Sequence, residues 1–326
     1  MMHMKIGVLG AGHIADKVAC TLTAMQEIEC YAVASRSLQK AEGFAQKHGF
    51  AVAYGSYEEM LRDPAVELVY VTTPHSHHYE HMMLAIEHGK NILCEKAFTL
   101  NAAQARTVQK AAAKKGVFVA EAIWTRYMPS RQVIQSVLES GIIGTPNTLT
   151  ANLSYVIGQV ERIRRPELAG GALLDIGVYG INFALMHFGK NIARIESAVQ
   201  KMDSGVDAME TITLFYEDGR MAVLTNSVYC RSDRKGIIHG DKGYMVVENI
   251  NNPQSLSVYD ADDTLIAFYD FSDQISGYEF QFRECKARID AGKIESISMP
   301  MDETVYVMEF MDRLRQTWGV VYPQEQ

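Results

Sequence analysis

Residues 4–15 read MKIGVLGAGHIA, and this stretch decides the first half of the fold. Its apolar run is typical of a buried strand, and the glycines after it lead into a helical pattern that begins at Ile14. Gly10, Gly12 and Ala15 match the pattern G-x-G-x-x-G/A. The first glycine permits a tight turn, the second lets a pyrophosphate approach the backbone, and the small third residue lets helix and strand pack closely. We therefore expect a dinucleotide-binding turn, with His13 and Ile14 opening its helix.

Strands and helices alternate through the rest of the first half. The further strands are expected at 28–35, 51–54, 67–73, 90–94 and 117–122, with helices at 37–47, about 56–63, 78–88 and 101–115. Ser56 with Glu59, and Asn101 with Gln104, have the spacing of helix N-terminal caps. This rhythm with short connections predicts a Rossmann-type doubly wound parallel sheet.

The second half has a different pattern. Strands are expected at 147–157, 192–202, 208–216, 220–229, 234–238, 243–250, 255–259 and 264–269. One helix is expected to end near residue 140, and three others are expected at 173–188, 278–291 and 302–317. This predicts an α+β domain with an open, mostly antiparallel sheet covered by helices. We expect domains at 1–122 and 123–326, with helix 302–317 able to pack back on the first. Strands 208–216 and 220–228 have no clearly polar face, which favours a homodimer or homotetramer through this sheet.

Composition restricts the function classes. The 326 residues carry 31 Lys and Arg against 39 Asp and Glu, a net charge of −8, which argues against nucleic acid or an anionic membrane as a partner. No apolar run approaches the roughly 18 residues that span a bilayer. The five cysteines form no CxxC pair, so we expect reduced thiols in the cytoplasm.

The segment after the second strand indicates which cofactor is preferred. It reads Ser35-Arg36-Ser37 with Lys40 one turn later, and no carboxylate occurs before Glu42. An NAD-selective site holds the ribose 2′-OH with Asp or Glu, whereas a guanidinium, hydroxyls and an ammonium suit a 2′-phosphate. We therefore expect NADP, with NAD as the alternative.

Polar residues follow two further strands at their carboxyl ends, where open α/β sheets bind ligands. They are Thr72, Thr73 and His75 after one strand and Glu95-Lys96 after another. A lysine there can hold a substrate oxygen and favour the charged form of a nearby acid. His77 and His81 have the i, i+4 spacing of metal ligands, but no third ligand is evident, so we expect no metal.

The segment Gly170–Tyr179 (GGALLDIGVY) is the chemical candidate of the second half. Asp175 and Tyr179 are four residues apart and share a helix face. A tyrosine hydroxyl, with an ordinary pKa of about 10, becomes a better base beside a cation. A half-buried tyrosine with an aspartate in the first helical turn would also be explained by packing and the helix dipole alone. The nearby basic run 162–165 fits either an anionic substrate or a solvated loop.

Taken together, these motifs resemble the glucose–fructose oxidoreductase/inositol dehydrogenase/MocA family. They are GAGHIA, ASRS…KA, TTPHSHH, CEKAFTLNAAQA, EAIWTRYMP, GGALLDIGVYGIN and the closing GVVYPQ, and they run nearly end to end. Within the family they are most similar to the dimeric dihydrodiol dehydrogenases and the NADP-dependent D-xylose dehydrogenases.

The resemblance implies roles for individual residues. Lys96, Asp175 and Tyr179 would be the catalytic group. The residues that would line the cofactor are Gly10, Gly12, His13, Ile14, Ser35, Arg36, Lys40, Thr72, Thr73, His75, Glu95 and Lys96, with His78 supporting its loop and Trp124 and Arg126 bordering the nicotinamide. Ala97 replaces the proline that usually follows the lysine, which leaves the orientation of Lys96 less constrained.

The implied reaction is hydride transfer between nicotinamide and a secondary alcohol or hemiacetal carbon of a sugar, polyol or trans-dihydrodiol. Two alternatives stay open. One is reduction of a keto-sugar, an anhydro-sugar or a dicarbonyl at the same site. The other is a non-enzymatic NADP-binding regulator, which would have no need of the three catalytic residues.

Overall fold

The computed structural model describes residues 3–325, which form two compact units. The first comprises the chain up to Trp124 together with Ile275–Glu309. The second comprises Thr125–Gln274 and the chain from Phe310 onward, so the division falls within one helix, α10 (Met301–Trp318). Each unit has its own sheet and its own core.

The sheet of the first unit has six strands in the order β3-β2-β1-β4-β5-β6, and all its pairs are parallel. The strands are β1 (Met4–Leu9), β2 (Ile28–Ala34), β3 (Val52–Tyr54), β4 (Leu68–Val71), β5 (Asn91–Glu95) and β6 (Val119–Ala122). The helices are α1 (His13–Ala24), α2 (Leu38–His48), α3 (Tyr57–Arg62), α4 (His78–Glu87), α5 (Ala102–Lys115) and α9 (Glu279–Asp290), with a 3-10 turn at His75–His77. The strand order reverses between β1 and β4, which makes the carboxyl ends of these strands a ligand site by topology. The predicted doubly wound parallel sheet is confirmed.

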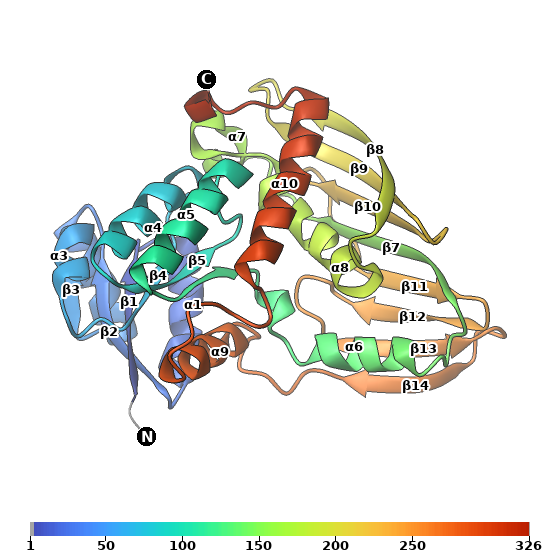
Figure 1. Ribbon diagram of the computed structural model, residues 1–326, viewed down its shortest axis with the longest axis horizontal. Helices are drawn as coiled ribbons and strands as arrows, with labels where there is room; N and C mark the ends of the chain where they lie inside the picture. The colour runs from blue at the N-terminus through green and yellow to red at the C-terminus, as the bar shows by residue number, and fades with distance from the viewer. Residues whose placement is uncertain (1–2, 326) are drawn as a thin grey trace. The chain divides into compact units, whose positions relative to one another are not determined.

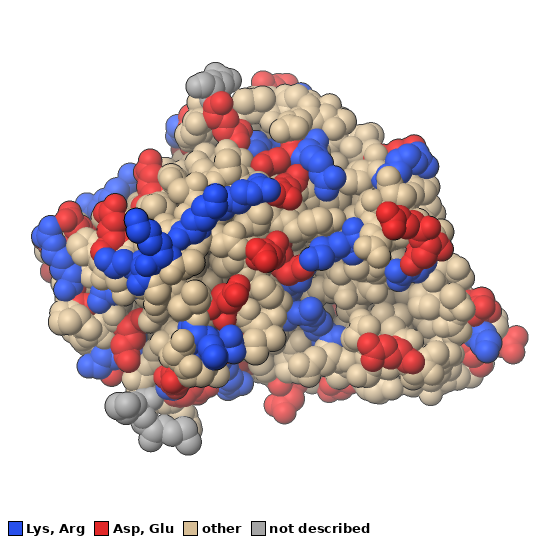
Figure 2. Space-filling view, in the orientation of Figure 1, with Lys and Arg blue, Asp and Glu red and all other residues tan. Residues whose placement is uncertain are grey.

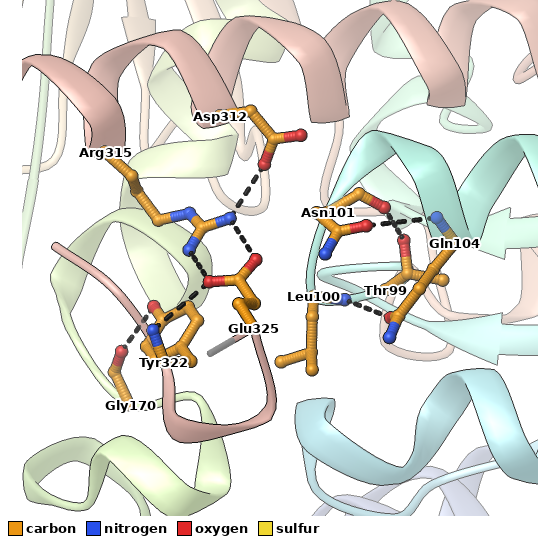
Figure 3. Close-up of polar contacts among 9 residues, drawn as sticks. All are labelled: Thr99, Leu100, Asn101, Gln104, Gly170, Asp312, Arg315, Tyr322 and Glu325. Atoms are coloured by element: carbon orange, nitrogen blue, oxygen red, sulfur yellow. Dashed lines mark hydrogen bonds and ion pairs between the residues drawn. The ribbon is translucent and has the colours of Figure 1, made fainter.

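Local capping explains where two of these helices, α5 and α2, begin. Asn101 Oδ1 accepts from Gln104 N at 3.0 Å, and Gln104 Oε1 accepts from Leu100 N at 3.1 Å, as Figure 3 shows. Ser37 Oγ likewise accepts from Lys40 N at 3.3 Å and caps α2. Ser56 lies at the expected start of α3, but the expectation that its side chain caps the helix was wrong, because that side chain makes no capping hydrogen bond. Water can satisfy the first N–H groups of so short a surface helix.

The sheet of the second unit has eight strands in the order β14-β13-β12-β11-β7-β10-β9-β8. All its pairs are antiparallel except β10 with β7. The strands are β7 (Pro146–Ser154), β8 (Ile192–Lys201), β9 (Asp207–Tyr216), β10 (Met221–Ser227), β11 (Gly236–Gly240), β12 (Gly243–Glu248), β13 (Ser255–Asp260) and β14 (Leu265–Asp270). The helices are α6 (Ser130–Glu139), α7 (Glu161–Arg164) and α8 (Val178–Phe188), with short turns at Trp124–Arg126, Pro166–Leu168, Leu173–Gly177 and Pro323–Glu325. Figure 1 shows α6 and α8 in front of this sheet, as the predicted helix-covered sheet requires.

Two expectations for the helix before Gly189 need correction. The turn Leu173–Gly177 is a π-helix, and the α-helix α8 begins only at Val178. Such wider turns occur mostly as single insertions in α-helices, often at functional sites. In addition, the stretch Pro166–Phe188 does reach the length and hydropathy of a membrane span, but 94% of its apolar window is buried inside the protein. Packing of this helix against its own sheet explains its hydropathy.

The C-terminal tail is tied to the second unit by buried polar contacts. Arg315 donates to both carboxylate oxygens of Glu325, at 2.7 and 2.9 Å, and to Asp312 at 2.8 Å. Tyr322 is fully buried and donates its hydroxyl to the carbonyl of Gly170 at 2.8 Å, as Figure 3 shows. The tail therefore fixes the start of the segment that leads into the π-helical turn.

Basic side chains gather locally on the surface. On the face drawn in Figure 2, Lys and Arg side chains form one continuous row across the first unit, and elsewhere on this face basic and acidic side chains are interspersed. The net charge of −8 therefore does not exclude a local gathering of basic side chains.

Candidate active site

The glycine turn has the geometry that close approach of a phosphate needs. Gly10 has a φ of +108°, and a Cβ there would lie 3.0 Å from Thr72 Oγ1 and 3.2 Å from Thr73 Cγ2. Thr72, directly after β4, donates its hydroxyl to the carbonyl of Gly10 at 2.7 Å, and this hydrogen bond holds the glycine turn in place. Gly12 is the N-cap of α1 without a side-chain cap, which leaves the first helical N–H groups, from His13 and Ile14, available for an anion.

The segment after β2 is shaped by two serines. Ser35 is buried, and its hydroxyl accepts from Ser37 N at 3.4 Å, while Ser37 caps α2. The side chains of Arg36 and Lys40 are exposed. The backbone of this segment is therefore ordered by the serines, and the two cations are left on the surface at the carboxyl end of β2.

His78 ties two loops of the first unit together. It is fully buried, with Nε2 2.7 Å from the carbonyl of Thr73 and Nδ1 2.8 Å from the carbonyl of Ala97. Burial lowers the pKa of His78 to about 4, while the bonds to the two carbonyls oppose this shift, since a charged ring donates to both. The loop after β4 and the loop that carries Lys96 are therefore held at one fixed spacing.

The other histidines of this loop have local partners. His81 Nδ1 lies 2.9 Å from Thr73 Oγ1, and burial lowers the pKa of His81 to about 4. His77 Nδ1 lies 2.9 Å from Ser76 Oγ, and its ring stacks on that of His81. His75 packs edge-on against His78. Within residues 3–325, no group of three or more His, Cys, Asp or Glu side chains is arranged to hold a metal ion.

Lys96 follows strand β5 directly and is half-buried. Glu95 before it is buried and accepts a hydrogen bond from the hydroxyl of Tyr70, which is also fully buried. The peptide bond between Lys96 and Ala97 is cis. Buried neighbours on β4 and β5 and the contact of His78 with Ala97 thus fix the backbone from which the Lys96 side chain extends.

Two aromatic residues of the first unit form a platform that the sequence did not reveal. Trp124 is buried and stacks on Tyr278, with ring centroids 4.0 Å apart and planes 13° apart. Lys17 Nζ lies 5.3 Å from the centroid of Tyr278, within the range of a cation–π contact. Tyr278 comes from the returning segment just before α9, and no motif marks it, because its partner is more than 150 residues away in the sequence.

Arg126 is held within the second unit by Asn182, a residue to which the sequence motifs assign no role. Its side chain is buried, and Nε donates to Asn182 Oδ1 at 2.6 Å. Asn182 in turn donates to the carbonyl of Val178 at 2.8 Å. The position of Asn182 in the motif GVYGIN was the available signal for this contact.

Asp175 and Tyr179 lie at the junction of the π-helical turn and α8, and both are buried. Asp175 Oδ1 accepts from Arg162 Nη1 at 2.5 Å, and Oδ2 accepts from Nη2 at 3.3 Å. Glu210 approaches Gly177, which lies between them, so closely that a Cβ there would be 2.7 Å from Glu210 Oε1 and the carboxylate would have to shift. The buried Glu210 carboxyl and the π-helical turn therefore pack directly against each other.

The candidate residues thus fall into both units. The first unit brings the glycine turn, Thr72, Thr73 and His78 together and holds the backbone of Lys96 through His78. The second unit places Asp175 and Tyr179 on one helical segment. A glycine-rich anion site beside the carboxyl ends of parallel strands can hold a dinucleotide, and a lysine, a tyrosine and a carboxylate can bind and deprotonate a hydroxyl.

Comparisons with known proteins agree with the fold of both units. Residues 4–122 match the family described as "Oxidoreductase family, NAD-binding Rossmann fold", and residues 132–246 match the "GFO/IDH/MocA C-terminal domain". The chain is 32% identical to trans-1,2-dihydrobenzene-1,2-diol dehydrogenase of Mus musculus and 33% identical to that of Danio rerio, over 99% of each chain.

Solved structures share the fold. An aldose–aldose oxidoreductase from Caulobacter crescentus has a TM-score of 0.87 at 19% identity, with 97% of this chain and 98% of that chain covered. A 3-ketoreductase from Actinomadura kijaniata, crystallised with NADP and TDP-benzene, has a TM-score of 0.87 at 22% identity, with 96% and 97% covered. The resemblance drawn from the motifs is confirmed, and the chain belongs to the GFO/IDH/MocA family of oxidoreductases.

Proposed function

We propose that this protein is an NAD(P)-dependent oxidoreductase that transfers a hydride between nicotinamide and a secondary alcohol or hemiacetal carbon of a sugar, polyol or trans-dihydrodiol. One observation carries the proposal: Lys96, Asp175 and Tyr179 are all present in a chain that is 32% identical, over its full length, to dihydrodiol dehydrogenases. The neighbours named as sugar oxidoreductases and ketoreductases support the same substrate class.

In the proposed reaction, the nicotinamide supplies the hydride chemistry when it is bound. The protein's own residues handle the proton and the oxygen. Tyr179 exchanges the hydroxyl proton, Lys96 binds the reacting oxygen and favours ionisation of the tyrosine, and Asp175 orients the reacting group. The low exposure of Tyr179 and Asp175 supports these roles, because water is largely excluded from both side chains.

The test replaces each functional group conservatively. Lys96→Met and Tyr179→Phe should lower kcat by about 100-fold or more, in the range typical of general acid–base catalysis. Lys114→Met and Tyr229→Phe are the matched controls, since both side chains lie on the surface. Turnover is followed by nicotinamide absorbance with trans-1,2-dihydrobenzene-1,2-diol, D-xylose and a keto-sugar, in both directions. Undiminished turnover in either catalytic variant would remove that residue's role.

The same screen separates the alternatives. Activity confined to keto-sugars, anhydro-sugars or dicarbonyls with NADPH would favour a reductase. Silence across the panel despite tight NADPH binding would favour a regulator. The presence of Lys96, Asp175 and Tyr179 supports the enzyme, because a sensor of NADPH does not need all three.

For the cofactor we propose a preference for NADP over NAD. Arg36 and Lys40 are exposed beside the carboxyl end of β2, and no carboxylate replaces them there. A charge-assisted contact to the 2′-phosphate is worth about 1.5–3 kcal/mol. Arg36→Asp should therefore weaken NADPH binding by about 10-fold or more, while NADH binding improves, as measured by fluorescence titration. An Arg36→Asp variant that keeps its preference for NADPH would contradict the assignment.

We also propose a homodimer or homotetramer formed through the second sheet, in the cytoplasm. Strand β14 leaves Leu265 and Phe268 more than half exposed, at 51% and 58%, which is unusual for apolar side chains side by side on one strand. The five cysteines are all free thiols, which suits a reducing compartment. Light scattering should give two or four copies, and a monomer at micromolar concentration would contradict the proposal. Cell fractionation tests the compartment.

A further inference from the structure

Arg162 and Asp175 form a two-pronged ion pair. Nη1 of the guanidinium donates to Oδ1 at 2.5 Å and Nη2 donates to Oδ2 at 3.3 Å, so both carboxylate oxygens have an Arg162 donor. The Asp175 side chain is only 7% exposed, whereas that of Arg162 is 47% exposed. A nearly buried carboxylate is costly unless a cation or hydrogen-bond donors compensate it.

Backbone contacts on either side of Arg162 fix the position of the short helix that carries it. Its neighbour Ile163 is fully buried, and the carbonyl of Ile163 accepts from Gly171 N at 2.9 Å. Gly170 approaches so closely that a Cβ there would lie 2.4 Å from the same carbonyl. The short helix α7 is therefore fastened to the chain that immediately precedes the π-helical turn.

The other arginines of the basic run behave differently. Arg165 pairs with Glu161 and Glu167 on the surface. Arg164 is exposed. Arg162 thus contacts the segment that carries Asp175, whereas Arg165 pairs with neighbouring surface carboxylates.

We propose that Arg162 is a positioning residue that holds the Asp175 carboxylate ionised and in one orientation for the substrate. The inference rests on the proposed role of Asp175 and goes beyond it. A planar guanidinium fixes a carboxylate by two parallel bonds, which a lysine ammonium cannot do. Because half of the Arg162 side chain remains exposed, the pair stays in contact with solvent.

The experiment combines single variants with a double-mutant cycle. Arg162→Ala, Arg162→Lys, Asp175→Asn and the double variant Arg162→Ala/Asp175→Asn are compared with the control Arg164→Ala from the same short helix. Each is assayed for kcat and KM with NADP+ and trans-1,2-dihydrobenzene-1,2-diol, for NADPH affinity by fluorescence, and for its urea unfolding midpoint.

We expect Arg162→Ala to lower kcat by about 10- to 100-fold, the loss of a charge-assisted bidentate contact, with NADPH affinity unchanged. Arg162→Lys should recover part of this loss, and added guanidinium ion should restore activity to Arg162→Ala but not to Asp175→Asn. The kcat effects and the unfolding midpoints of the pair should be non-additive, since the two residues act through one contact. Arg164→Ala should resemble the wild type.

Other outcomes would contradict either the role of Arg162 or the proposed role of Asp175, and the two cases can be told apart. Turnover of Arg162→Ala within twofold of Arg164→Ala, or additive effects in the cycle, would overturn the inference while leaving the proposed function intact. Wild-type turnover by Asp175→Asn would instead remove the proposed role of Asp175. The cycle of unfolding midpoints does not depend on turnover, so additive midpoints overturn the pairing even if the diol is not a substrate.

Discussion

Replacing Tyr322 by phenylalanine removes one buried hydrogen bond and little else. The side chain is fully buried, and its hydroxyl donates to the carbonyl of Gly170 at 2.8 Å (Figure 3). Phenylalanine keeps the ring, so no cavity forms around it. Burial raises the pKa of Tyr322 well above its ordinary value, which keeps the hydroxyl a neutral donor at every accessible pH.

The expected loss follows from the carbonyl that remains. Gly170 O would stay buried without its donor, and an unsatisfied buried acceptor costs about 1–3 kcal/mol. We therefore expect Tyr322→Phe to lower the unfolding free energy of the second unit by about 2 kcal/mol. The loss should be the same at pH 6 and pH 8.

Urea denaturation measures this loss, with Trp318 as the reporter. The chain has two tryptophans, so a Trp124→Phe background leaves the fluorescence of Trp318, which is buried in the second unit. Tyr229→Phe, at an exposed tyrosine, is the control and should change stability by less than about 0.5 kcal/mol. A loss for Tyr322→Phe as small as the control's would refute the reasoning, and one above about 4 kcal/mol would show that the ring packing had changed.

Three further predictions concern substitutions of single residues. Asn101→Ala should cost about 1 kcal/mol in urea denaturation, because its side chain caps α5, and Asn101→Asp should recover most of that loss; equal stability of all three proteins would contradict the cap. Gly10→Ala should abolish detectable NADPH binding in a fluorescence titration while the protein stays folded, since the residue has a positive φ and a Cβ would meet Thr72; retained affinity would argue against this turn as the phosphate site. Burial lowers the pKa of His187 to about 3, and neither ring nitrogen has a hydrogen-bond partner within residues 3–325. As the pH falls below about 6.5 the unfolded chain binds a proton that the folded protein does not, so about 2 kcal/mol of stability present at pH 7.5 is lost at pH 5. His187→Gln should show a shallower loss between these two pH values, and an unchanged loss would show that His187 does not titrate in this way.

Much of the architecture could be predicted because its signals are local. The glycine turn, the buried strand β4 and the cap at Asn101 depend on residues within one turn or one strand of each other. Their hydrogen bonds and periodicity are therefore written into adjacent positions. Lys96, Asp175 and Tyr179 could also be recognised as candidate catalytic residues from the sequence, because each lies in a motif.

The sequence by itself thus determined the class of both sheets, the dinucleotide turn and the candidate chemistry. Only the tertiary structure decided that residues 275–309 return to the first unit, that Tyr278 stacks on Trp124, and that Arg162 pairs with Asp175. The π-helical turn before α8 belongs with these, since a buried Glu210 packed against Gly177 has no counterpart in local periodicity. The physical reason is the same in each case: these contacts join groups far apart or differently oriented along the chain, and packing of a whole unit brings them within reach.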